Sequence, residues 1–235
     1  MALPFFYISE YAPSQKEIVL DEDTSRHVVQ VLRMKEGEKL NLTDGKGNLI
    51  TAEVIDAHKK HCAVNVLDSR LISQVSRKIT IAISLLKNTN RFEWFLEKAT
   101  EIGVSEIIPL ICERTEKQKF RYDRMKGICI SAMLQSQQTW LPILSEPKQF
   151  DDMVIQQFDQ QQKFIAHCDE SSVKKQLSTF QSFNSSIILI GPEGDFTKDE
   201  IKLALENNFI PVSLGETRLR TETAGIVAAS LLRQV

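Results

Sequence analysis

The sequence predicts an α/β protein in two parts, a small β-barrel followed by a larger domain built on a parallel sheet. First, short and closely spaced strand patterns occupy the chain up to about residue 72, which is typical of a small barrel. Second, from Ile79 onward apolar strand patterns alternate with helical ones, the order that produces a parallel sheet. Third, two late strands each run directly into a glycine turn, where open α/β folds place their ligands.

The first part is expected to be mostly β-structure, with one short helix at 24–32. Residues 39–43 alternate between polar and apolar with a period of two, and the Asp-Gly-Lys-Gly sequence at 44–47 has the composition of a hairpin turn. Further strands are expected at 5–8, 49–55 and 62–67.

The second part begins after a linker at about 70–78, and we place the domain boundaries at 1–72 and 73–235. One connecting helix carries Phe92, Phe95 and Ala99 on one face and stops at Gly103. A second helix is expected at 122–135. The strands of the sheet are expected at 79–86, 107–110, 163–167, 186–190 and 210–214.

Composition limits the classes of function. A net charge of −2 argues against a domain that binds nucleic acid by bulk charge, but it is compatible with a local basic face. The four cysteines are scattered and no histidine lies at a metal-ligand spacing from them, so we expect reduced thiols and no metal site. Reduced thiols fit a cytoplasmic protein. The apolar stretch 2–8 is too short for a signal peptide or a membrane span, so we expect no contact with a membrane.

The two glycine turns are the strongest local signal of a binding site. Gly191-Pro192 and Gly194 follow the strand at 186–190, and Gly215 follows the strand at 210–214. Glycine lets a backbone approach a ligand closely, so two such turns at neighbouring strand ends suggest one ligand held by backbone groups. For Gly191 alone, a tight turn between strand and helix is the simpler interpretation.

The segment after the second turn places charged and hydroxyl side chains at the start of a helix. Its sequence is Arg-Thr-Glu-Thr at 220–223, and the residues that follow, 226–232, are almost entirely apolar. A helix that is apolar all round is usually buried. Its polar entrance is therefore expected at an interior site and not on the open surface.

These motifs resemble a known family. IGPEGDF at 190–196 and LGETRLRTETAG at 214–225 are similar to the two C-terminal signature segments of the RsmE methyltransferases, members of the SPOUT superfamily. The resemblance extends to 97–104 in the predicted central helix and to 26–27 and 31–33 near the start. It implies a parallel sheet with a trefoil knot, a PUA-like barrel that contacts RNA, and a homodimer.

The resemblance also implies an activity, S-adenosylmethionine (SAM)-dependent methylation of N3 of a uridine in 16S ribosomal RNA. The substrate is either that RNA or the assembled small ribosomal subunit. The residues that correspond to the cofactor pocket are Leu189, Ile190, Gly191, Pro192, Glu193, Gly194, Ser213, Leu214, Gly215, Leu219, Arg220, Thr221 and Thr223.

The chemistry requires a group that stabilises negative charge, because uridine N3 becomes a good nucleophile only after losing its proton. Arg220 is the first candidate, since a guanidinium beside the uracil carbonyl oxygens would stabilise the anion. Glu222 could accept the proton or orient the arginine. As alternatives, Arg220 could form an ion pair with Glu222 or Glu193. Glu222 could also simply stabilise the helix, because a negative charge interacts favourably with the positive end of the helix dipole.

RNA contacts are expected from cationic and polar side chains on both parts, although each one alone could be an ordinary surface charge. The candidates are Arg26, Arg33, Lys87, Asn88, Arg91 and Arg114. Two positions depart from the RsmE pattern, because Gln138 and Thr217 stand where arginine is common. A non-catalytic RNA-binding module that retains the fold is the alternative function.

Overall fold

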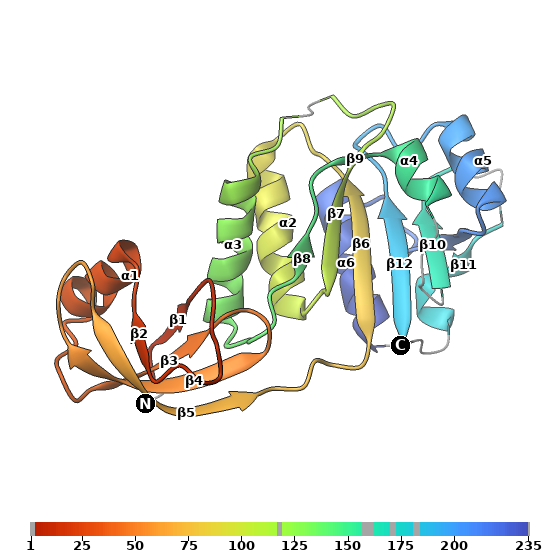
Figure 1. Ribbon diagram of the computed structural model, residues 1–235. Coiled ribbons are helices and arrows are strands. Elements are labelled where there is room, and N and C mark those ends of the chain that lie inside the picture. Colours follow the sequence, from red (N-terminus) through yellow and green to blue (C-terminus); the bar gives the residue numbers. More distant parts are fainter. Residues whose placement is uncertain (1–2, 117–118, 157–161, 170–172, 181–183, 235) are drawn as a thin grey trace. The chain divides into compact units, whose positions relative to one another are not determined.

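The computed structural model describes residues 3–116, 119–156, 162–169, 173–180 and 184–234 (Figure 1). The chain divides into two compact units. One contains the residues up to Gln74 together with Met133–Leu141, and the other contains Val75–Ala132 and the residues from Pro142 onward. The division at residue 72 remains a prediction, and the segment Met133–Leu141 belongs to the first unit despite its place in the sequence.

The first unit is a five-stranded sheet in the order β1-β3-β4-β5-β2. β1 pairs with β3 in parallel, and the other neighbours are antiparallel. Alternate side chains of β3 and β4, among them Leu40, Leu42 and Ile50, are fully buried in one core. The strands are β1 (Phe5–Tyr7), β2 (Glu17–Val19), β3 (Lys39–Thr43), β4 (Asn48–Asp56) and β5 (Ala63–Leu71).

The predicted helix at 24–32 is two short elements. α1 (Glu22–Arg26) has Asp21 as its N-cap, and the Asp21 carboxylate accepts a hydrogen bond from the Thr24 amide. The π-helical η1 (His27–Val31) follows α1. The wider turn is visible in the bond from the Leu32 amide to the carbonyl of His27, five residues earlier. The segment ends at Arg33, which has a left-handed backbone (φ 56°).

Met133–Leu141 joins the first unit through the Asp44–Gly47 turn. The carbonyl of Thr139 accepts a hydrogen bond from the Gly47 amide (2.8 Å), and the Leu141 amide donates to Gly45 (2.9 Å). Trp140 donates from Nε1 to the carbonyl of Ile72 (2.9 Å), and a Cβ on Gly47 would lie 2.5 Å from its ring. The glycine therefore permits a close approach between residues 93 positions apart, which no local sequence pattern encodes.

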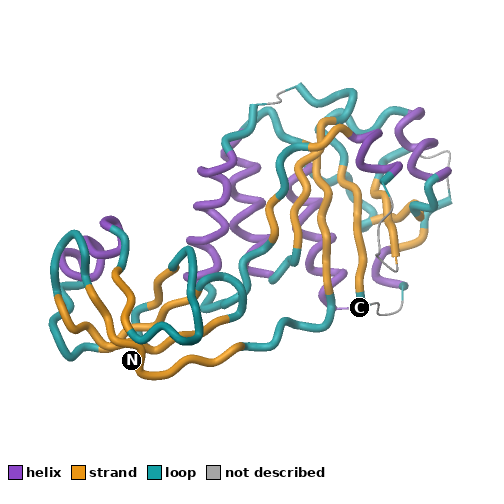
Figure 2. Tube along the Cα trace, in the orientation of Figure 1, coloured by secondary structure: helices purple, strands orange, loops and turns teal. Residues whose placement is uncertain are grey.

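The second unit is built on an eight-stranded sheet in the order β11-β13-β10-β12-β6-β7-β8, with β9 also paired to β7. Figure 2 draws the strands in orange and the helices in purple. All of its described pairings are parallel, as predicted. The strands are β6 (Lys78–Ser84), β7 (Glu106–Ile111), β8 (Ile143–Leu144), β9 (Lys148–Gln149), β10 (Gln162–Ala166), β11 (Lys175–Gln176), β12 (Ser185–Ile190) and β13 (Ile210–Ser213).

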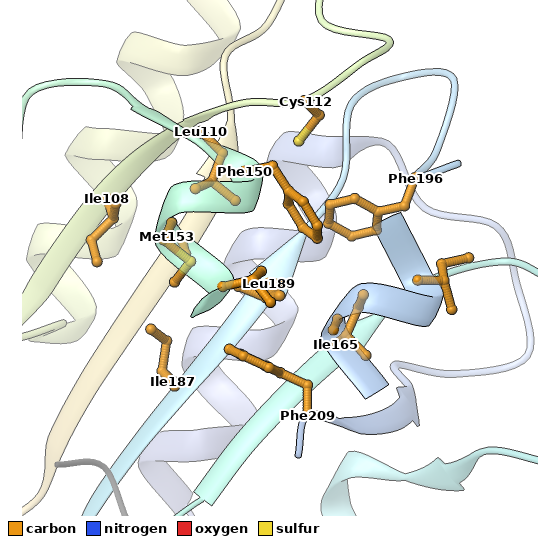
Figure 3. Packing of buried hydrophobic residues seen from close by; sticks show 14 residues of the cluster. Ile108, Leu110, Cys112, Phe150, Met153, Ile165, Ile187, Leu189, Phe196 and Phe209 are labelled. Atoms are coloured by element: carbon orange, nitrogen blue, oxygen red, sulfur yellow. The ribbon is translucent and has the colours of Figure 1, made fainter. Parts of the chain in front are cut away.

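Helices cover both faces of this sheet because its strands are apolar on both sides. On β6, Ala82 faces the cluster formed with α4 and α5, while Ile83 approaches α6. Figure 3 shows the first cluster, in which the rings of Phe150 and Phe196 pack at 5.2 Å above Leu189. The helices are α2 (Thr89–Ile102), α3 (Tyr122–Gln135), α4 (Phe150–Ile155), α5 (Lys198–Glu206) and α6 (Thr221–Gln234), with a 3₁₀ turn η2 (Leu177–Thr179).

The connection between β13 and α6 crosses the carboxyl edge of the sheet. β13 is separated from β6 by β10 and β12, yet α6 packs against β6 and β12 and against α2. Residues 214–220 therefore pass the ends of β10 and β12. A trefoil knot, which the resemblance implies, remains a prediction.

The contact between α6 and α2 gives a first testable consequence. A Cβ on Gly225 would lie 2.6 Å from Cε2 of Phe95, a ring that is fully buried. We expect Gly225→Ala to lower the free energy of unfolding by about 1–3 kcal/mol, because overpacking displaces a fixed core ring. Urea unfolding measures this loss.

Gly127 provides the matched control for Gly225. It lies within α3, and a Cβ there would meet no atom within 4 Å. Gly127→Ala should therefore leave stability unchanged or raise it by up to about 1 kcal/mol through helix propensity. Equal effects of the two substitutions would contradict the packing argument.

Candidate cofactor and catalytic site

A cavity of about 720 Å³ lies beyond the carboxyl ends of β10, β12 and β13. The turn after β12 and the crossing loop after β13 form most of its wall, as predicted for the two glycine turns. Ser213 ties the start of the crossing loop together, since its hydroxyl donates to the carbonyl of Gly215 (2.8 Å) and accepts from the amide of Gly215. Gly215 is exposed, with a φ of +142° that side-chain-bearing residues rarely adopt.

Most of the predicted pocket residues line this cavity. They are Ile190, Gly191, Pro192, Glu193, Ser213, Leu214, Gly215, Leu219, Arg220 and Thr221.

Leu189, Gly194 and Thr223 are not part of the lining. Leu189 points into the core with α4 and α5, because successive strand residues face opposite sides. Gly194 lies against the side chain of Arg114, whose guanidinium donates to the Gly194 carbonyl (2.7 Å). Thr223 is two residues beyond Thr221, so it projects from roughly the opposite side of α6.

The end of β10 supplies residues that the sequence interpretation missed, namely Ala166, His167, Cys168 and nearby Lys174. They line the cavity because β10 lies between β12 and β13 in the sheet. The Cys168 amide donates to the carboxylate of Asp195 (2.8 Å), which joins the β10 end to the first glycine turn. The strand itself was predicted at 163–167. Its carboxyl end was the feature of the sequence that could have indicated these lining residues.

Burial in the cavity wall and the nearby Lys174 ammonium lower the pKa of His167 below its ordinary 6.5. As the pH falls below about 6.5, the unfolded chain gains this proton before the folded chain does, so acidification should destabilise the fold. We expect His167→Gln to weaken this dependence, as measured by urea unfolding across that pH range. The exposed His58→Gln is the control, and identical pH profiles for wild type and His167→Gln would contradict the assignment.

The two catalytic candidates have different environments. Arg220 is exposed at the cavity, and in the described part of the chain it forms no ion pair. Glu222 is buried on the side of α6 that faces α2, where its Oε1 lies 3.7 Å from Nε of Arg91. Its Oε2 is buried and has no hydrogen-bond partner among the residues that the structure describes. Glu193 accepts a hydrogen bond from the Lys87 amide (3.3 Å). Among the described ion pairs, none joins Arg220 to Glu193 or Glu222.

Comparisons with known proteins give the family. Residues 73–233 match the RNA methyltransferase domain, and residues 20–67 match the PUA domain of RNA methyltransferases. The chain belongs to the RNA methyltransferase family.

Similar proteins narrow the relationship within the RNA methyltransferases. Ribosomal RNA small subunit methyltransferase E of Rickettsia conorii is 28% identical over 229 residues, which is 97% of this chain and 93% of that protein. The crystal structure of a probable rRNA-methyltransferase from Porphyromonas gingivalis superimposes with a TM-score of 0.92 at 38% identity, covering 99% of this chain and 98% of the other.

A third relative was solved with a ligand. It is ribosomal RNA small subunit methyltransferase E of Neisseria gonorrhoeae bound to S-adenosyl methionine, with a TM-score of 0.88 and 28% identity over 99% of this chain and 97% of the other. Membership of the RsmE group and an α/β fold with an N-terminal PUA domain, both predicted from the motifs, are confirmed.

The predicted RNA contacts on the second unit of this RNA methyltransferase have partners within the protein. Lys87 forms an ion pair with Glu116 (2.7 Å), which raises the pKa of its ammonium. Asn88 is the N-cap of α2 and accepts from the Asn90 amide. Arg91 lies against Glu222, and Arg114 supports the first glycine turn, as described above.

The two predicted RNA contacts on the first unit, called the PUA unit because it contains the matched PUA domain, differ in their ion pairing. Arg26 forms exposed ion pairs with Glu22 and Asp23, of the kind that contribute little to stability and exchange readily. Arg33 occupies the left-handed position after the π-turn, and no ion pair engages it among the described residues.

Within the described chain, no group of three or more His, Cys, Asp or Glu side chains is arranged to hold a metal. None of its helices combines the length and apolar character needed to span a bilayer.

Proposed function

We propose that this protein transfers a methyl group from SAM to N3 of a uridine in 16S ribosomal RNA, either free or in the assembled small subunit. One observation carries the proposal. The two glycine turns line a single cavity, and Arg220 is exposed at it. The chain belongs to the RNA methyltransferase family, and a relative solved with bound SAM matches almost its whole length. Small-subunit ribosomal RNA as substrate implies action in the cytoplasm.

The cavity suits the proposed cofactor. Its volume of about 720 Å³ lies within the usual range for ligand sites, roughly 300–1,000 Å³. A Cβ on Gly215 would meet no atom of the described residues within 4 Å, so this part of the backbone can approach a ligand closely. We propose that the predicted lining residues hold SAM, and that Leu189, Gly194 and Thr223 support them from behind.

When bound, SAM supplies an electrophilic methyl group. The protein would orient the uracil and stabilise the charge left on its carbonyl oxygens when the N3 proton departs. Arg220 fits this role because it is exposed at the cavity and its guanidinium offers a planar set of charged donors. Glu222 fits a positioning role, since its carboxylate is buried against Arg91 and does not line the cavity.

The proposal includes a homodimer. Ile226, Val227 and Leu231 of α6 are only half-buried, whereas Ala228, Ala229 and Leu232 are buried in the fold. Apolar side chains left partly exposed on one helix are typical of a surface that a second copy covers. We expect a dimer in sedimentation velocity at micromolar concentration. Leu231→Arg should shift the protein toward monomer, and a monomeric wild type would exclude this part of the proposal.

Methyl transfer tests the function directly. Labelled SAM is incubated with the protein and either 16S ribosomal RNA or small subunits that lack the modification, and the product nucleoside is identified by mass spectrometry. We expect 3-methyluridine. Binding of SAM without transfer to either substrate would favour the non-catalytic RNA-binding module, and methylation at another base atom would exclude uridine N3.

A further inference from the structure

A second, smaller cavity of about 280 Å³ lies where α2 and α3 begin. Its polar side chains are strongly biased toward positive charge, with Lys119, Arg121 and Arg124 against the single carboxylate of Glu93. None of the three cations was among the expected RNA contacts. The cavity is also distinct from the proposed SAM site, since the two share no lining residue.

Among the described residues that line this cavity, the single carboxylate is already neutralised. Arg124 donates to Glu93 through Nε (2.6 Å) and Nη2 (2.9 Å), a two-bond pair, and this contact lowers the pKa of Glu93. Lys119 and Arg121 are exposed, and within the described residues neither forms an ion pair. The charge of Arg121 also contributes to the lowered pKa of Glu93. With three cations and one carboxylate, the described lining keeps a net positive charge that an anionic ligand can meet.

These two cations lie on an anchored segment. Phe120, the residue between them, packs edge-on against the buried ring of Phe92 at 6.2 Å. Tyr122, the residue after Arg121, donates its hydroxyl to the carbonyl of Leu144 (3.2 Å). The backbone at 119–122 is thus held on both sides of Arg121, which reduces the conformational entropy lost when a ligand binds.

The cavity adjoins the proposed catalytic entrance. Asn90 lines the cavity, and the next residue, Arg91, lies 3.7 Å from Glu222 in the first turn of α6. Arg220 precedes that turn by one residue. Because α2 follows β6 and all these strands are parallel, both sites lie at the carboxyl edge of the same sheet.

We propose that this cavity binds a backbone phosphate of the RNA substrate, near the target uridine, through Lys119 and Arg121. Arginine offers a planar pair of donors that matches phosphate oxygens, and lysine adds a point charge. Phosphate contacts set the register of a nucleic acid without reading its sequence. The inference rests on the proposed function and adds to it the means by which the uridine is brought to Arg220.

The test measures RNA affinity as a function of salt concentration for the full-length protein. The probe is a labelled 16S ribosomal RNA transcript, and the variant is the double substitution Lys119→Ala and Arg121→Ala. We expect affinity to fall about tenfold at low salt, and the slope of log K against log salt to fall in magnitude by about 1, the value for one lost phosphate contact. SAM affinity should stay at the wild-type value.

Two further variants control for charge and folding. Lys175→Ala with Lys198→Ala removes the same charge from exposed positions outside both cavities, and it should keep the wild-type salt slope. Lys119→Arg with Arg121→Lys keeps the charge and should restore most of the affinity. An unchanged slope in the Lys119/Arg121 alanine variant, or an equal change in the Lys175/Lys198 variant, would overturn the proposal.

The remaining outcomes separate this inference from the proposed function. If wild type methylates the RNA and the alanine variant binds it with an unchanged salt slope, only the phosphate site is wrong. If wild type binds SAM but transfers no methyl group to either substrate, the proposed function is wrong, and the inference that rests on it is overturned with it. Heat on titration with inorganic phosphate, together with unchanged RNA binding by the variant, would assign the cavity to a free anion and overturn the proposal.

Discussion

Arg220→Ala is expected to lower the single-turnover rate of methyl transfer by roughly 100- to 1000-fold, with little change in the affinity for SAM or RNA. The reason is that, in the proposed mechanism, the guanidinium acts on charge that develops only as N3 loses its proton. Removing one such donor from a water-poor site costs about 2.7–4 kcal/mol in other enzymes. Arg220 is the candidate because it is exposed at the cavity mouth and carries no ion pair among the described residues.

Neighbouring variants determine whether the position or only the charge matters. Arg220→Lys keeps a positive charge but loses the planar pair of donors, so we expect an intermediate rate. Arg218 lines the same cavity two residues earlier, and it stands next to Thr217, where the RsmE pattern has arginine. If Arg218→Ala abolishes transfer while Arg220→Ala is near the wild-type rate, the two arginines exchange roles and the present assignment is wrong.

Gly215→Val is expected to abolish detectable SAM binding by titration calorimetry. The structure leaves the space around the Gly215 Cβ position open, with the crossing loop forming one wall of the cavity. A branched side chain there would occupy the volume in which a ligand meets the backbone. It would also strain the loop, because a φ of +142° is unfavourable for valine.

A substitution at Gly37 separates the loss of ligand volume from the backbone strain. It also has a positive φ (+85°) with no atom within 4 Å of a Cβ, but it belongs to the PUA unit and lies outside the cavity. Gly37→Val therefore introduces comparable backbone strain and should retain SAM affinity. Near-normal SAM binding by Gly215→Val would mean that the crossing loop does not contact the cofactor in the proposed way.

Local sequence patterns predicted much of the architecture because strands, turns and caps are set by neighbouring residues. The apolar runs that end at Gly191 and Gly215 are β12 and β13, and their parallel direction follows from the alternation of strands and helices. α5 begins at a capping box, in which Thr197 and Glu200 make both reciprocal hydrogen bonds. Each of these features depends on residues a few positions apart.

The composition of the cavity depended on contacts between distant segments. The end of β10 lines it because the fold inserts that strand between β12 and β13, which the order of elements along the chain does not reveal. His167 and Lys174 were missed for this reason. In the same way, Met133–Leu141 joins the PUA unit through Thr139, whose hydrogen-bond partners are more than 90 residues away.

What the sequence determined by itself was therefore the elements, the two glycine turns and the family, all of which are carried by contiguous motifs. What only the tertiary structure decided was the use of individual charges. Arg91 and Arg114 look like surface cations in the sequence, yet one lies against the buried Glu222 and the other supports Gly194. Lys119 and Arg121 remain available because Arg124 takes the nearby carboxylate of Glu93. Charge pairing depends on distances across the fold, and the spacing of residues along the chain does not contain those distances.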